Sequence, residues 1–276
     1  MRYDQTILLS DLDGTLFDRH MHVSARSIEA IRRYTQAGGL FGICSGRSRC
    51  NALRFLDGVV LNAPCVLCNG AVVSDLAAGR VLQATTLPAG PLRAPIEACI
   101  AGYPGLFAEA YYADETAVLR PENEVPRDLI ERHGPCIFRT LDEIGTEGWL
   151  KALFYGDAAQ MQHLHDRLLD TWHAPDWAEV FFTSVGSGGP NFLELVPKGA
   201  DKGAALAVVR AQPAVQGRTL FAAGDYYNDV PMLEAADYGI APANALDCAK
   251  KAARFVTVAC DEDVIAHVID EIIPSV

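Results

Sequence analysis

The chain has 276 residues, half of them apolar, and a formal net charge of −12. This length predicts two domains, and the composition is typical of a globular protein. The acidic excess disfavours nucleic acid and anionic membrane surfaces, because both bind basic faces. The sequence has no run of about twenty apolar residues, and its polar start leads directly into a predicted strand. We therefore expect a cytoplasmic protein with neither a nucleic-acid nor a membrane partner.

Strands and helices alternate at both ends of the chain. The first part predicts strands at residues 7–9, 40–44, 64–67 and 71–73, with a helix that begins at the Ser24 cap and a short helix that ends near Leu56. The last part predicts helices at 201–210, 230–236, 245–253 and 264–273, and strands at 220–223, 238–241 and 255–258. This alternation predicts an α/β fold with a Rossmann-like, doubly wound parallel sheet.

The middle of the chain differs from its two ends. It is richer in aromatic residues and in proline, and the prolines at 88, 91, 95, 104, 121, 126 and 135 are expected to mark loops. Strands are predicted at 149–155, 179–184 and 192–196, and an amphipathic helix at 158–172. We therefore predict a discontinuous core domain formed by residues 1–82 and 197–276, with an α+β domain inserted at 83–196.

The eight cysteines raise the question of a metal or redox site. Cys65 and Cys68 have the spacing of such a pair, but no second CxxC and no nearby histidine pair accompany them. Cys44 and Cys99 also lie in apolar stretches. We expect all four to be buried as small apolar side chains, and the cysteines to be free thiols in a reducing compartment.

Two carboxylates follow the first predicted strand. Asp11 and Asp13 belong to the sequence DLDGT, where a buried strand ends and a glycine turn begins. Asp11 is therefore a candidate nucleophile, and Asp13 is close enough to move a proton for it. The alternative is an ordinary acidic turn in solvent. An EF-hand is excluded, because Leu16 and His22 stand where that loop needs glycine and glutamate.

A second acidic segment, GDYYND, follows the predicted strand at 220–223. Ligands of open parallel sheets bind beyond the carboxyl ends of the strands, so four carboxylates are expected to meet there: Asp11, Asp13, Asp225 and Asp229. Such a group needs a cation, and carboxylate oxygens with an open coordination shell suit Mg²⁺. Alternatively, Asp229 caps the helix at Pro231.

Two further segments suit a phosphate group. Ser45, Gly46 and Arg47 stand between a strand and a helix, where a hydroxyl and backbone N–H groups can hold an anion. The segment KGADKG, residues 198–203, supplies a cation at the start of another helix. A Walker P-loop is excluded at residues 42–48, because one residue is missing between the glycines and Arg47 replaces the lysine.

Together these four segments resemble the motifs of the haloacid dehalogenase superfamily, whose members are aspartate-nucleophile phosphotransferases. DLDGT is similar to its first motif, the serine of ICSGR to its second, the later lysine of KGADKG to its third and GDYYND to its fourth. The long insertion, the turn CNGA at 68–71 and the sequence GDYYNDVPML resemble the Cof-type branch, subfamily IIB, which carries a C2-type cap. Cys44 departs from the pattern, since such proteins often have alanine or threonine there.

The resemblance implies a Mg²⁺-dependent phosphomonoesterase. Asp11 would form an aspartyl-phosphate, and Asp13 would protonate the leaving alcohol and then activate water. The Asp11 and Asp225 carboxylates and the Asp13 carbonyl would hold Mg²⁺, with Asp229 orienting that shell. The residues implied to bind the phosphoryl oxygens are Ser45, Gly46, Lys202 and Asn228. Related ion pumps have threonine in place of Asp13, which favours a phosphatase here.

The inserted domain is expected to select the substrate, a small phosphorylated metabolite such as a sugar phosphate. Candidate substrate contacts are Arg47, Asn69, Asn191 and Glu194. Arg47 binds either a second anionic group or a structural carboxylate. Tyr111 and Tyr112 are more simply part of the inserted domain's core, and the loop at 186–191 is either a substrate contact or a hairpin connection. Two other functions stay open, a phosphosugar mutase with the same nucleophile and a non-catalytic ligand-binding protein of this fold. The sequence does not indicate whether the protein forms oligomers.

Overall fold

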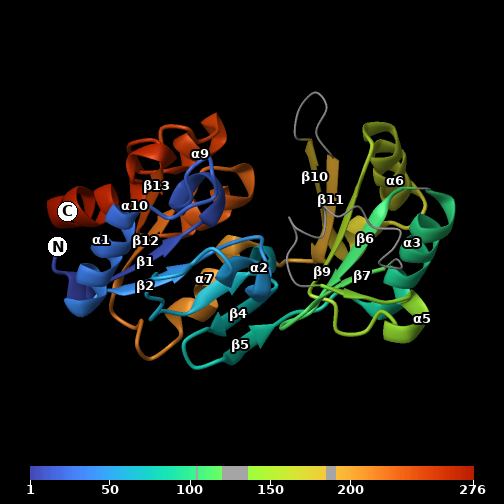
Figure 1. Ribbon diagram of the computed structural model, residues 1–276, viewed down its shortest axis with the longest axis horizontal. Coiled ribbons are helices and arrows are strands. Elements are labelled where there is room, and N and C mark those ends of the chain that lie inside the picture. Colours follow the sequence, from blue (N-terminus) through green and yellow to red (C-terminus); the bar gives the residue numbers. More distant parts are fainter. Residues whose placement is uncertain (104, 120–135, 185–190) are drawn as a thin grey trace. The chain divides into compact units, whose positions relative to one another are not determined.

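The computed structural model describes residues 1–103, 105–119, 136–184 and 191–276. The chain divides into two compact units (Figure 1). The first contains residues 1–47, 52–83 and 201–276, and the second contains residues 48–51 and 84–200. The second unit therefore lies as an insertion within the first. The predicted limits were 82/83 and 196/197, so the units differ from the prediction at residue 83, at residues 197–200 and at the short segment 48–51.

A five-stranded parallel sheet forms the centre of the first unit. Its order is β14-β13-β12-β1-β2, with the strands at Phe255–Val256, Tyr238–Ala241, Thr219–Ala223, Thr6–Ser10 and Leu40–Ile43. The residues of β1 and β2 are buried throughout, which explains why these strands are continuous apolar runs. The predicted α/β class with a parallel sheet is confirmed. Because β1 pairs with β12, their carboxyl ends lie side by side.

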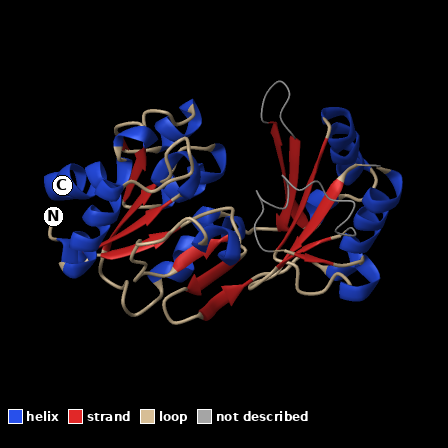
Figure 2. Ribbon diagram, in the orientation of Figure 1, coloured by secondary structure: helices blue, strands red, loops and turns tan. Residues whose placement is uncertain are grey.

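Helices surround this sheet (Figure 2). They are α1 Ala25–Gln36, α7 Lys202–Arg210, α8 Val230–Ala235, α9 Asp247–Ala252, α10 Val264–His267 and α11 Ile273–Ser275. Helix α2, Arg49–Leu53, contains residues of both units. Ser24 caps α1 as predicted, since its hydroxyl accepts from the Ser27 N–H. Leu206 of α7 and Leu233 of α8 are buried in one core cluster with Leu9 of β1. The amphipathic helices thus bury their apolar faces against the sheet.

A small antiparallel sheet completes the first unit. It contains β3 Cys65–Leu67, β4 Val72–Asp75 and β5 Arg80–Ala84. A parallel bridge between Cys44 and Val66 joins β3 to the end of β2. The four cysteines in question are buried free thiols, as predicted. Burial raises the pKa of the Cys65 thiol to about 12, which makes it a poor metal or redox group.

The second unit is an α+β domain built on a six-stranded sheet. The order is β10-β11-β9-β6-β7-β8, at Ala178–Ser184, Asn191–Pro197, Lys151–Gly156, Phe107–Tyr111, Thr116–Val118 and Ile137–Phe138. Its helices α3 Ala89–Gly102, α5 Leu141–Ile144 and α6 Ala158–Asp170 lie on one side of the sheet (Figure 1). Ile96, Phe154 and Leu164 are fully buried between α3, β9 and α6. The predicted α+β character of this part is confirmed.

Helix α3 corrects the expectation that the prolines mark loops. Pro91 and Pro95 both lie within this helix. Proline lacks an N–H, so Pro95 cannot donate to the carbonyl of Pro91, and one helical hydrogen bond is lost. Leu92, Ile96 and Cys99 recur at helical spacing and are all fully buried. Their packing against the sheet keeps the segment helical despite the prolines.

The β1 core provides a test of this packing. Leu9 is fully buried between β12 and β2, so Leu9→Ala should lower the free energy of unfolding by about 2–5 kcal/mol. Val256 in β14 is 56% exposed, and Val256→Ala should change it by about 0.5 kcal/mol or less. Urea denaturation of both variants measures the difference. Equal effects of the two substitutions would contradict the burial of Leu9.

Candidate active site

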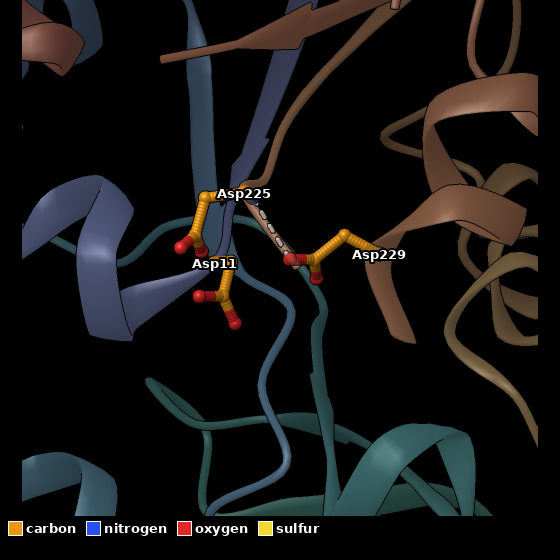
Figure 3. A group of neighbouring side chains, drawn as sticks. All are labelled: Asp11, Asp225 and Asp229. Atoms are coloured by element: carbon orange, nitrogen blue, oxygen red, sulfur yellow. Dashed lines mark hydrogen bonds between the residues drawn. The ribbon is translucent and has the colours of Figure 1, made fainter. Parts of the chain in front are cut away.

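Asp11 and Asp225 follow the carboxyl ends of two adjacent parallel strands. Asp11 comes directly after β1, and its N–H donates to the Ala223 carbonyl of β12 over 2.8 Å. Asp225 follows that strand by two residues. Figure 3 shows the carboxylates of Asp11, Asp225 and Asp229 gathered in one place. One oxygen from each lies within 4.8 Å of one from each of the others. The sheet topology therefore brings together acids that are more than two hundred residues apart in the sequence.

The turn after β1 depends on glycine. Gly14 has φ +77°, and a Cβ atom at this position would lie 2.4 Å from Oδ2 of Asp225. The absence of a side chain thus permits both the left-handed backbone and the close approach of the two loops. Thr15 then donates its hydroxyl to Oδ1 of Asp225 over 3.3 Å. The glycine and threonine of DLDGT serve to place the acid of the fourth motif.

A buried lysine lies between two of the carboxylates. Lys202 is 1% exposed, and its Nζ donates to Oδ1 of Asp11 over 2.6 Å and to Oδ1 of Asp229 over 2.5 Å. Lys202 begins α7, which Asp201 caps by accepting from the Ala204 N–H. Although burial acts to lower the pKa of Lys202, the charges of Asp11 and Asp229 raise it overall, so the ammonium stays charged.

The carboxylates remain crowded despite this lysine. Burial and the charge of Asp229 raise the pKa of Asp11 well above its usual value, even though Lys202 acts in the opposite direction. Burial and Asp229 also raise the pKa of Asp225, to about 7. Ionised Asp11 and Asp225 therefore lack sufficient positive charge around them.

This donor set fits a hard divalent cation. Carboxylate oxygens are the ligands that Mg²⁺ prefers, and Asp11 and Asp225 carry the charge that a cation would neutralise. Asp229 is already engaged, since its Oδ1 accepts from Lys202 and its Oδ2 accepts from the N–H groups of Asp225 and Tyr226. Asp229 therefore orients the loop, and its side chain does not cap α8, which was the alternative suggested by the sequence. In the part of the chain that the structure describes, this is the one cluster of potential metal ligands.

Asp13 forms a bidentate ion pair with Arg47. Its Oδ2 accepts from Arg47 Nε over 2.8 Å and its Oδ1 from Nη2 over 2.7 Å. The guanidinium also lies over the rings of Phe17 and Phe55. Of the two roles considered for Arg47, the structure shows pairing with a carboxylate, and that carboxylate belongs to the site. Both oxygens of Asp13 are occupied, so proton transfer by Asp13 requires this pair to open.

The remaining candidates of the first unit lie on neighbouring loops. Ser45 is 1% exposed, and its hydroxyl accepts from the Arg47 N–H over 3.2 Å. Asn228 donates its side-chain N–H to Oδ1 of Asn69 over 3.0 Å. Gly46 packs against the same Asn69 oxygen. Asn69 thus contacts two of the segments that are predicted to bind phosphate, one at Gly46 and the other at Asn228.

The second unit holds the other candidates. Glu194 of β11 forms an ion pair with Lys151 of β9 at 3.3 Å. Asn191 is a buried residue at the start of β11, and the rest of the loop at 186–191 lies outside the described residues. Tyr111 is buried and donates its hydroxyl to Glu109, while Tyr112 packs against the core of this unit. The core role favoured for Tyr112 is confirmed, and the substrate roles of Asn191 and Glu194 stay predictions.

The sequence profile of the haloacid dehalogenase-like hydrolases matches residues 8–269. The chain belongs to this family. A 5-amino-6-(5-phospho-D-ribitylamino)uracil phosphatase of Bacillus subtilis is 28% identical over 95% of this chain and 96% of its own length. A haloacid dehalogenase-like hydrolase from Bacteroides thetaiotaomicron has a TM-score of 0.82 and 25% identity, covering 97% of this chain and 99% of its own.

The fold also matches that of a known subclass IIB protein. A sugar phosphatase of haloacid dehalogenase subclass IIB matches with a TM-score of 0.75 and 19% identity, over 97% of this chain and 98% of its own. At this identity the likeness is one of fold. This haloacid dehalogenase-like hydrolase therefore has the fold that its four motifs predicted.

Four residues of the site were not predicted from the sequence. Thr15 contacts Asp225, and Asn244 donates its amide to the Gly14 carbonyl over 2.8 Å. Phe17 and Phe55 flank the guanidinium of Arg47. Thr15 belongs to the DLDGT motif, so the motif itself was a signal for it. Phe17, Phe55 and Asn244 lie outside the motifs and reach the site only through the tertiary fold.

A membrane-spanning helix is absent from the described residues, since none of their helices has both the length and the apolar character required.

Replacing the buried lysine tests the charge arrangement. Lys202→Met removes the cation between Asp11 and Asp229 and should lower the free energy of unfolding by about 3–5 kcal/mol. Lys202 lowers the pKa of Asp11, so this pKa rises further in the variant. A raised folded-state pKa gives stability that is present at low pH and lost as pH rises. The deficit, measured by chemical denaturation, should therefore be larger at pH 8 than at pH 5.

Lys251→Met is the matched control, because Lys251 is exposed in α9. It should change the free energy of unfolding by about 0.5 kcal/mol or less at both pH values. A Lys202 variant as stable as this control would show that the lysine does not stabilise the buried acids.

Proposed function

We propose that this chain is a Mg²⁺-dependent phosphomonoesterase that acts through an aspartyl-phosphate on Asp11. The observation that carries the proposal is the buried contact of Lys202 with Asp11, next to Asp225, at the carboxyl ends of β1 and β12. A nucleophile, a cation for the phosphoryl group and a divalent-metal donor set then occupy one place. The phosphatase names of its relatives support the reaction class.

In the first step, an oxygen of Asp11 attacks phosphorus and the bond from phosphorus to the leaving alcohol oxygen breaks. Asp13 gives its proton to that oxygen. In the second step, Asp13 takes a proton from water, the water oxygen attacks phosphorus, and the bond to Asp11 breaks to release phosphate. Lys202, Ser45, Gly46 and Asn228 would bind the phosphoryl oxygens and balance their negative charge. Arg47 must release Asp13 for either proton transfer, and an anionic substrate offers the guanidinium another partner.

Mg²⁺ would be held by the carboxylates of Asp11 and Asp225 and the backbone carbonyl of Asp13. When bound, it supplies positive charge that brings the anionic phosphoryl group to a carboxylate nucleophile. Asp229 would keep the Asp225 loop in place through the two N–H groups that it accepts.

We further propose that the substrate is a small phosphorylated metabolite, a sugar phosphate or a similar compound, selected by the second unit. The similarity to a 5-amino-6-(5-phospho-D-ribitylamino)uracil phosphatase and to a sugar phosphatase supports this class. Within the second unit, Glu194 and its partner Lys151 offer polar groups that suit hydroxylated leaving groups.

Asp11→Asn tests the nucleophile. We expect phosphate release from a panel of sugar phosphates, pyridoxal phosphate, flavin mononucleotide and an aryl phosphate to fall by about 10³-fold or more, because an amide oxygen is a poor nucleophile. Asp57→Asn makes the same change at an exposed residue and should leave turnover unchanged. Free phosphate from wild type also separates a phosphatase from a mutase, which keeps phosphate on its product. Turnover by Asp11→Asn equal to wild type would rule out this nucleophile.

The raised pKa of Asp225, about 7, predicts a pH-dependent effect of Mg²⁺ on stability. Protonated Asp225 favours the metal-free folded state, so that contribution is present below about pH 4 and is lost as pH rises through 7. Mg²⁺ competes with the proton for this carboxylate. At 100 times its Kd it should stabilise by about 2.7 kcal/mol, and the rise in melting temperature should be larger at pH 8 than at pH 5.

Thermal melts with Mg²⁺ and with chelator measure this effect. Asp225→Asn is the control, and it should abolish most of the Mg²⁺-induced shift at pH 8. An equal shift at both pH values, or one that survives in Asp225→Asn, would place the metal elsewhere.

A further inference from the structure

The turn at Cys68–Gly70 lies against all three of the loops that are proposed to bind phosphate. The N–H groups of Cys68 and Asn69 donate to the carbonyls of Arg47 and Ser45, over 3.0 and 3.1 Å. A Cβ atom on Gly70 would lie 2.2 Å from the Asp201 carbonyl oxygen, so this backbone packs directly on the residue that caps α7. The turn therefore contacts the Ser45 loop and the start of the Lys202 helix through its backbone.

The third contact is made by a side chain. Oδ1 of Asn69 accepts a hydrogen bond from Nδ2 of Asn228 over 3.0 Å. A Cβ atom on Gly46 would lie 2.8 Å from the same oxygen, so the carboxamide also packs closely against that glycine. Asn69 is 5% exposed. An asparagine amide has two N–H donors, so Asn228 keeps its second one for a phosphoryl oxygen.

The backbone of this turn is unusual. Cys68 and Asn69 are consecutive non-glycine residues with positive φ, +50° and +55°, and Gly70 follows at +98°. Asparagine accepts this conformation more readily than other side chains do. Such conformations persist where surrounding contacts impose them, and they concentrate at functional sites. In this conformation the Asn69 side chain reaches Asn228.

We propose that Asn69 is a positioning residue that orients the Asn228 amide for the phosphoryl group, an inference that rests on the proposed function. Asn69 was predicted as a substrate contact, and that role stays a prediction. Its Oδ1 faces Asn228 and Gly46. Through this oxygen, Asn69 acts on the reaction by way of Asn228.

Asn69→Gly removes only the carboxamide, because glycine accepts the left-handed backbone and keeps the N–H that donates to the Ser45 carbonyl. We expect the Kd for inorganic phosphate, measured by titration calorimetry with Mg²⁺, to rise about tenfold, the value of one hydrogen bond to a binding group. The kcat/KM for the best phosphomonoester should fall by a similar factor. In an Asn228→Ala background, the same substitution should change the Kd by less than about twofold, because the amide that it orients is gone.

Asn62→Ala is the structural control. Asn62 also makes two hydrogen bonds, with the Phe41 N–H and the Gly39 carbonyl, but it lies on a loop beside β2. This variant should lower the melting temperature and leave the Kd for phosphate within about twofold.

Two results would overturn the inference while leaving the proposed function intact: an Asn69→Gly enzyme that binds phosphate as tightly as an active wild type, or a tenfold effect that persists in the Asn228→Ala background. A wild type that neither binds nor releases phosphate would overturn both.

Discussion

The site depends on one buried ammonium. Lys202 lies between Asp11 and Asp229, and its contacts join the end of β1, the start of α7 and the loop before α8. Burying any of these charges alone would be strongly unfavourable, so each stabilises the position of the others. The arrangement leaves Asp11 and Asp225 with raised pKa values and an excess of carboxylates. One ammonium cannot neutralise three carboxylates. The remaining negative charge on Asp11 and Asp225 is what a divalent cation would balance.

Close backbone approaches make that arrangement possible. Gly14 allows the loop after β1 to reach Asp225, and Gly203 allows α7 to lie against Pro231, whose carbonyl oxygen would be 2.5 Å from an added Cβ. Gly70 does the same for the turn beside Asp201. These glycines have a common physical role: without a Cβ atom, two chain segments can approach closely enough for short polar side chains to meet. The motifs therefore include residues that carry no chemistry themselves but set the distances at which the chemistry occurs.

Much of the fold was predicted correctly from sequence patterns that depend on interactions between neighbouring residues. The alternation of apolar runs and capped helices predicted the parallel sheet, and Ser24 and Asp201 cap their helices because their side chains accept from nearby N–H groups. The acids of DLDGT and GDYYND were expected at one sheet edge because parallel strands end together. Helix α3 was missed, since its prolines indicate loops locally and only burial of Leu92, Ile96 and Cys99 against the sheet keeps it helical.

The sequence by itself determined which residues carry charge at the strand ends, the order of the motifs, and hence the family and the class of chemistry. Tertiary structure alone decided how those side chains are paired. Asp229 accepts from Lys202 and from two backbone N–H groups instead of capping α8, and Arg47 binds Asp13. Asn69 turns to Asn228. Apart from the two N–H groups that Asp229 accepts from its own loop, these contacts join residues that are far apart in the sequence, and their partners compete for the same few oxygens. Only packing in three dimensions selects among such partners, because hydrogen-bond geometry depends on positions that no local pattern records.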